Sequence, residues 1–213
     1  MESEKREVSY QEQAARNEIF CYLEAERKML AEVLQEDIAQ LVAIAKISLS
    51  GNHSSDAEDC LAMALSRLRA LSFEVKPQIL EEFGLAITLQ ELLHNRLNNT
   101  CHTTLYELPK NMGLLTETAL FRLVQQILNA LPTEKLSQFC LEVIRTGQHL
   151  CLKSRFKLGT YINSVKQVNL LMDKLYISIK HIIYMFNGNV AFQYFSDHEV
   201  EVMIYLDEIN GIL

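Results

Sequence analysis

The chain has 213 residues, of which 49% are hydrophobic and 22% are charged, and its formal net charge is −7 at pH 7. This length and composition are typical of a globular protein with one large domain or two small ones. The negative charge gives no electrostatic reason to expect nucleic acid or an anionic lipid surface as a partner. We therefore expect neither nucleic-acid binding nor direct insertion into a membrane.

The cysteines and the N-terminus bear on the cellular compartment. Five widely spaced cysteines form no C-x-x-C pair: Cys21, Cys60, Cys101, Cys140 and Cys151. An odd number in this arrangement predicts reduced thiols in a cytosolic protein. The polar N-terminus is unlike a signal peptide, and no apolar stretch reaches the roughly 18 residues of a membrane span. We expect a cytoplasmic protein, and the spacing of the histidines predicts no metal site.

The N-terminal region predicts one long helix. From about Ser9 to Leu49 the chain has no Pro and no Gly, and strong helix formers dominate. Steps of three and four residues connect most positions of an apolar seam: Leu23, Leu30, Leu34, Ile38, Leu41, Ala45 and Ser48. Because propensity alone cannot stabilise so long a helix, the seam needs a partner.

A second helix follows a turn in Gly51–Asp59 and stops near Pro77. Its apolar face consists of Leu61, Ala64, Leu65, Leu68, Leu71 and Val75. Two antiparallel helices make half of a four-helix bundle, and a homodimer would complete it by pairing identical seams. The alternative is a monomeric hairpin that packs on the rest of the chain.

Beyond Pro77, helical and strand patterns alternate. Amphipathic spacing predicts helices over Gly84–Asn99, Leu115–Leu131 and Asn163–Phe186. Strand patterns occupy Thr103–Leu108 and two hairpins, Ser137–Arg145 with His149–Phe156 and Val190–Phe195 with Val200–Leu206. This order predicts an α+β fold in which helices cover one face of a mainly antiparallel sheet.

Three runs of sequence resemble the cytoplasmic core of bacterial sensor histidine kinases. Glu26–Gln40 (ERKMLAEVLQEDIAQ) resembles their dimerisation and phosphoacceptor helix, in the branch that reads E-R-x-x-[IL]-A-x-x-L-H-D-x-[LIV]-[GA]-Q. Leu71–Leu85 (LSFEVKPQILEEFGL) is similar to the second helix of that branch, and Leu120–Gln126 (LFRLVQQ) to the approach to its nucleotide-binding helix. The resemblance implies a dimeric four-helix bundle in residues 1–79 and an ATPase-like α/β sandwich in residues 80–213.

The chain departs from this family where the kinase chemistry needs particular residues. Gln35 stands in place of the phosphoacceptor histidine, and a carboxamide has no basic nitrogen to attack a phosphoryl group. A gapless alignment puts Ala130 where the family has a magnesium-binding Asn, and Asn129 lies one residue early. Phe156–Thr160 (FKLGT) stands where the family has D-x-G-x-G; it contains Gly159 but not the aspartate that reads adenine. No second glycine-rich lid segment follows. We therefore expect a lid-less sandwich with no nucleotide cofactor and no autokinase activity.

The resemblance still implies a partner-binding surface on the first helix, formed by Arg27, Leu30, Leu34, Asp37 and Ile38. The leading hypothesis is a non-kinase regulator of a two-component system that binds a response regulator or an intact histidine kinase. A second hypothesis is a phosphatase of the regulator's aspartyl phosphate, because Glu36 and Gln40 keep the spacing of the family's D-x-x-x-Q motif. A third is an anti-sigma-like or purely structural dimeric binding module.

Overall fold

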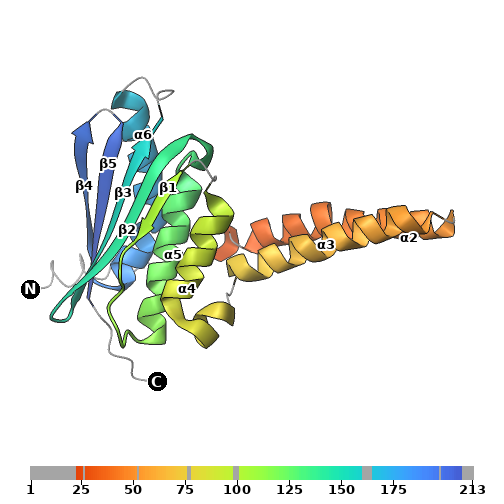
Figure 1. Ribbon diagram of the computed structural model, residues 1–213, viewed down its shortest axis with the longest axis horizontal. Helices are drawn as coiled ribbons and strands as arrows, with labels where there is room; N and C mark the ends of the chain where they lie inside the picture. Colours follow the sequence, from red (N-terminus) through yellow and green to blue (C-terminus); the bar gives the residue numbers. More distant parts are fainter. Residues whose placement is uncertain are drawn as a thin grey trace, which may run out of the picture. The chain divides into compact units, whose positions relative to one another are not determined.

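The structure, a computed structural model, describes residues 23–25, 27–51, 53–75, 78–97, 101–159, 165–196 and 198–207. The chain divides into two compact units, Met1–Gln78 and Ile79–Leu213. The predicted α+β class is confirmed, since a helical hairpin precedes a unit of helices and a five-stranded sheet (Figure 1).

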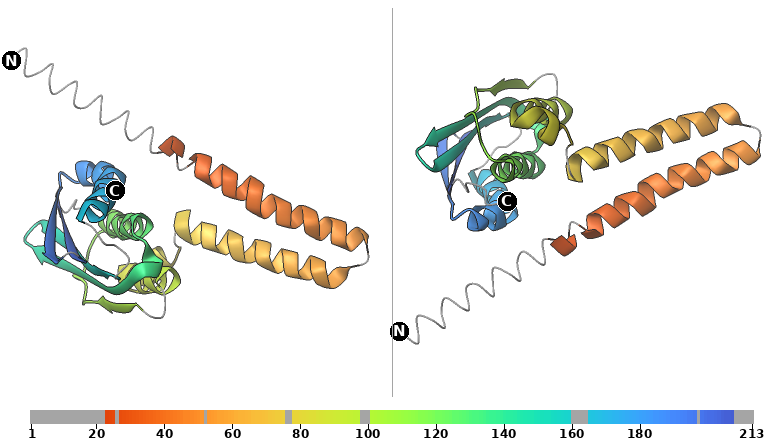
Figure 2. Two further views of the ribbon diagram at one scale, coloured as in Figure 1. Left: turned by 90° about the horizontal axis from the view of Figure 1, so that it is seen from above. Right: turned by 90° about the horizontal axis from the view of Figure 1, so that it is seen from below.

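The first unit is a hairpin of two long helices. Its first arm is helical over residues 23–25 and 27–32 and continues through a π turn, η1 (Val33–Ile38), into α2 (Ala39–Ser50). The second arm is α3 (Ser54–Val75), which runs back beside α2 (Figure 2). Ala45, Ala57 and Ala64 are almost completely buried, because small side chains allow the two backbones to approach closely.

The second unit alternates helices and strands. Its helices are α4 (Gln78–Arg96), α5 (Leu114–Ala130), the short 3₁₀ turn η2 (Thr133–Lys135) and α6 (Val165–Met185). Its strands are β1 (His102–Leu105), β2 (Leu136–Thr146), β3 (His149–Leu158), β4 (Asn189–Ser196) and β5 (Glu199–Asp207). Both predicted hairpins are present, and Gly147 supplies the positive φ of 65° that the first hairpin turn requires.

The sheet has the strand order β1-β2-β3-β5-β4, with β1 parallel to β2 and the other pairs antiparallel. Every second residue of β2, β3 and β5 points toward the helices, as the two-residue period of a strand dictates. This inner face holds the core, in which Phe139 on β2 lies directly opposite Phe156 on β3. None of the described helices of the second unit lies on the other face of the sheet, as Figure 2 shows.

Two of the predicted elements differ from the structure. The predicted strand Thr103–Leu108 is shorter, because β1 pairs with β2 only as far as Leu105. The predicted helix at Gly84 is preceded by another helical segment, and Gly84 itself has φ 78° and ψ 176°. An L side chain rarely adopts that conformation, so glycine permits the break between the two segments.

A contact between α5 and α4 holds the helix that begins after this break. The carboxylate of Glu117 accepts a hydrogen bond from the backbone N–H of Leu85, one of the groups that a helix N-terminus leaves without an intrahelical partner. Burial raises the pKa of Glu117, and this hydrogen bond partly offsets the rise. Glu117 therefore contacts the start of a helix that lies far from it in sequence.

Candidate functional site

The first arm of the hairpin carries the residues that the sequence marks as functional. They lie in and just after η1, where the backbone N–H of Ala39 donates to the carbonyl oxygen of Leu34, five residues earlier. The resulting π turn is a rare local geometry that often occurs at functional sites. Gln35 and Glu36 lie inside it, and Gln40 lies on the first turn of α2. The side chains of all three are exposed.

The buried row of this arm differs from the predicted seam. The residues of this arm that are buried or half-buried are Leu30, Val33, Asp37, Ile38, Leu41, Ala45 and Ser48. Two residues of the predicted seam, Leu23 and Leu34, are 45% and 44% exposed, so their place in the buried row was predicted wrongly. Around η1 the buried row runs through Val33, Asp37 and Leu41 in steps of four residues, and Leu34 lies outside it.

Two ion pairs lie near the site. The Asp37 carboxylate contacts the Arg67 guanidinium at 3.1 Å and links η1 to α3. Arg27 pairs with Glu24 at 2.7 Å on the same helix. The four side chains are 46% to 74% exposed, so each pair contributes only about 0–1 kcal/mol to folding. Of the predicted partner-binding residues, Arg27 and Leu34 are exposed, Leu30 and Asp37 are half-buried, and Ile38 is 8% exposed.

The positions that correspond to the family's nucleotide site lie in the second unit. Asn129 is exposed and Ala130 is half-buried in the last turn of α5. Gly159 follows β3, and its backbone N–H donates to the carbonyl oxygen of Lys135 at 2.7 Å. A Cβ atom at Gly159 would lie 3.1 Å from that oxygen, so this glycine permits close packing between β3 and η2. The expectation that a glycine-rich lid is missing concerns the segment after Gly159. Residues 160–164 of this segment lie outside the described part of the chain, and α6 follows them.

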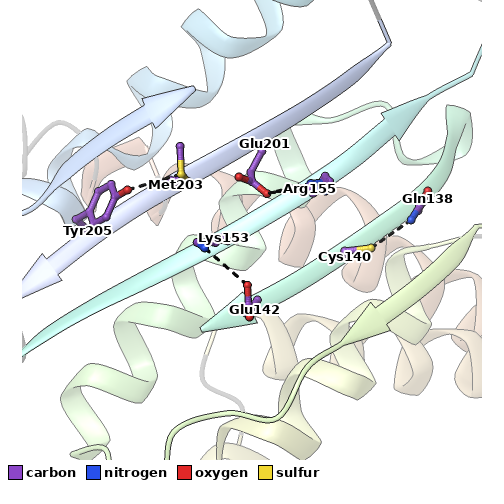
Figure 3. Close-up of polar contacts among 8 residues, drawn as sticks. All are labelled: Gln138, Cys140, Glu142, Lys153, Arg155, Glu201, Met203 and Tyr205. Atoms are coloured by element: carbon purple, nitrogen blue, oxygen red, sulfur yellow. Dashed lines mark hydrogen bonds and ion pairs between the residues drawn. The ribbon is translucent and has the colours of Figure 1, made fainter. Parts of the chain in front are cut away.

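A cluster that the sequence analysis missed lies on the open face of the sheet. Arg155 on β3 contacts the Glu201 carboxylate on β5 at 2.8 Å (Figure 3). The Arg155 guanidinium also lies over the Phe195 ring, 4.4 Å from its centre. Glu201 is only 8% exposed although none of the described helices of this unit covers the face. A neighbouring cross-strand pair joins Lys153 to Glu142 at 3.9 Å. The alternation of charged residues along β3 and β5 was visible in the sequence, but pairing them required the strand register.

Two grooves lie along the described part of the sheet, the first of them on this face. One, of about 310 Å³, is lined by Tyr106, Gln138, Cys140, Glu142, Lys153, Arg155, Glu199 and Glu201. The other, of about 470 Å³, lies at one end of the sheet, where His149 contacts Asp207 at 2.7 Å and Cys151 lies near Tyr205. Among the described residues, no three His, Cys, Asp or Glu side chains could hold a metal ion together.

The described thiols are poorly suited to nucleophilic chemistry. The four described cysteines are free, and Cys101 is buried while the other three are half-buried. Burial raises the pKa of the Cys101 and Cys151 thiols, which disfavours the thiolate that a nucleophile needs. The Cys151, His149 and Asp207 side chains therefore do not form an activated triad.

No family model matches the sequence, and no curated protein matches it. Among solved structures, the chain is similar to a bacterial phosphotransferase, with a TM-score of 0.51 and 11% identity over 83% of this chain and 94% of the other. It is also similar to the Acinetobacter baumannii histidine kinase AdeS, with a TM-score of 0.43 and 10% identity over 84% and 98%.

A third similar structure is the histidine kinase domain of the Erythrobacter litoralis EL346 blue-light activated histidine kinase. Its TM-score is 0.46, with 12% identity over 85% of this chain and 91% of the other. The likeness to the phosphotransferase, which spans both units, shows that the two chains share a fold. None of the described helices is both long enough and apolar enough to cross a membrane.

Proposed function

We propose that this protein is a non-kinase regulator of a two-component system that binds a response regulator, or an intact histidine kinase, through its helical hairpin. The observation that carries the proposal is the exposure of Gln35 and Glu36 in η1 and of Gln40 just after it, where the sequence resembles a phosphoacceptor helix. The site has the exposure that docking of a partner protein needs. It lacks the imidazole that would receive a phosphoryl group.

The departures in the second unit also support a role without autokinase activity. Neither Phe156 nor the adjoining β3 residues supply the carboxylate that the family uses to recognise adenine. A regulator that only binds, or that acts on a phosphoryl group already carried by its partner, needs no nucleotide. The binding test is complex formation with a receiver domain, measured on the full chain.

The hairpin surface favours assembly into a homodimer. On α3, one row of side chains faces α2, while Leu61, Leu65 and Leu68 form a second, exposed apolar row at helical spacing. A two-helix hairpin cannot bury both rows by itself, and a second copy would complete a four-helix bundle. The same seam in each copy would then contact its equivalent about a two-fold axis.

Light scattering after size-exclusion chromatography tests this dimer. We expect the full chain to have twice its 24.5 kDa monomer mass at micromolar concentration. Leu65→Glu should give the monomer mass, because it introduces a charge into the exposed apolar row. Ser66→Glu is the matched control, since it adds the same charge at the neighbouring exposed position and should leave the dimer intact. A wild-type chain of monomer mass would refute the dimer.

A second candidate function is hydrolysis of the partner's aspartyl phosphate. It is favoured by the exposure of both Glu36 and Gln40, whose side chains are free to approach a docked receiver domain. A Gln side chain can orient a water molecule in line with the phosphorus, while the receiver supplies its own metal and acid. This mechanism requires neither a histidine nor ATP.

The decay of a phosphorylated receiver domain, measured with and without the full chain, tests this candidate. If the chain is a phosphatase, we expect faster decay that returns to the basal rate with Gln40→Ala, a loss of at least about tenfold in the added rate. Ala43→Ser, a change at an exposed position on the same helix, is the control and should keep the wild-type rate. Unchanged decay in the presence of a detectable complex would leave binding as the function.

A further inference from the structure

The groove on the open face of the sheet has a lining that combines both signs of charge. Its volume of about 310 Å³ is at the lower end of the range of ligand pockets, which is roughly 300–1,000 Å³. Two cations line it, Lys153 and Arg155, together with the carboxylates of Glu142, Glu199 and Glu201. These residues come from three neighbouring strands, and Figure 3 shows four of them on one face of the sheet. A ligand in this groove would therefore meet opposite charges close together.

Arg155 and Glu201 form the fixed part of this groove. Nε of Arg155 donates to one oxygen of Glu201, Oε2, at 3.0 Å, and Nη2 lies 2.8 Å from the same oxygen. The guanidinium also lies over the Phe195 ring, and Glu201 is 8% exposed. A planar guanidinium that is held in this way keeps the orientation of its remaining N–H groups. Both side chains are thus preorganised before a ligand arrives.

This ion pair leaves hydrogen-bonding capacity unused on both partners. Within the described part of the chain, neither Oε1 of Glu201 nor Nη1 of Arg155 has a hydrogen-bond partner. A buried carboxylate oxygen without a donor is unfavourable unless water or a ligand supplies one. Beside the pair, the charged atoms of Lys153 and Glu142 are 3.9 Å apart, which is longer than a hydrogen bond. The groove therefore offers donors and acceptors to a ligand that carries both kinds of group.

We propose that this groove binds a free α-amino acid, with the ligand's carboxylate toward Arg155 and Lys153 and its ammonium toward Glu201. The two cations are two residues apart on β3, so their side chains lie on the same face of the sheet. An anion alone would face three carboxylates, and a cation alone would leave the donors of Arg155 and Lys153 without an acceptor. A zwitterion satisfies both sets, because its two charges are adjacent. The site lies within the second unit and does not depend on the proposed function.

Isothermal titration calorimetry of the full chain with each standard L-amino acid tests this site. The strongest binder is then compared with its amide, which lacks the carboxylate, and with its N-acetyl derivative, which lacks the ammonium. We expect both derivatives to bind at least about tenfold more weakly, because each leaves a charged group of the groove without a partner. Equal affinity of either derivative, or no binding of any amino acid at millimolar concentration, would overturn the proposal.

Two lysines on β3 give a matched pair of variants. Lys153→Met removes a cation of the groove, whereas Lys157→Met makes the same change at an exposed position of the same strand, outside the lining. We expect Lys153→Met to bind the amino acid at least about tenfold more weakly than Lys157→Met. Thermal unfolding checks that both variants remain folded, as expected because neither side chain is buried. If the two variants bind equally, the ligand does not lie in this groove and the proposal fails.

Discussion

Replacement of Gln35 with histidine is expected to let the chain accept a phosphoryl group from a phosphorylated receiver domain, but not from ATP. The position is exposed on the hairpin, and an imidazole nitrogen there can attack the aspartyl phosphate, which Gln35 cannot. Transfer moves the phosphoryl group from the aspartate carboxylate to the ring nitrogen. Mass spectrometry and phosphorus NMR would detect the phosphohistidine.

Two comparisons make this result specific. Gln35→Ala should accept no phosphoryl group, because it has no nucleophile at the same place. Incubation of Gln35→His with ATP and Mg²⁺ should leave the chain unlabelled, since the segment around Gly159 lacks the family's adenine-binding acid. Labelling of either the wild type or Gln35→His by ATP would contradict the loss of autokinase activity. Absence of transfer from a bound receiver would contradict the assignment of this position.

Phe139→Ala and Phe156→Ala are each expected to lower the free energy of unfolding of the second unit by about 3–5 kcal/mol. Both side chains are completely buried, and they lie opposite each other on the inner face of β2 and β3. Because they share a contact, the double variant should lose less than the sum of the single losses. Urea denaturation of the four proteins, followed by circular dichroism, would measure these differences.

The same two strands provide a matched control on the other face of the sheet. Glu142 and Lys153 also lie directly opposite each other, but they are partly exposed and their charged groups are 3.9 Å apart. Their alanine variants should each cost less than about 1 kcal/mol. If these losses equalled those of the phenylalanine variants, the assignment of inner and outer faces would be wrong.

The sequence by itself determined the secondary structure and the class of fold. Apolar periodicity predicted both ends of α5 and α6 to within two residues, and Gly147 indicated the turn of the first strand hairpin. These features depend on neighbours in the chain, so local patterns are sufficient to find them. The departure at Gln35 was visible for the same reason, because it is a change of one residue within a recognisable motif.

Only the tertiary structure decided which side chains meet and which remain outside. Leu23 and Leu34 are exposed although both fit the apolar periodicity, because periodicity does not show which of two adjacent apolar rows faces the neighbouring helix. The Asp37–Arg67 and Arg155–Glu201 pairs, and the Glu117 contact with Leu85, join residues far apart in the chain. Each depends on the position of one element against another, and that position is set by packing of the core, which no local pattern contains.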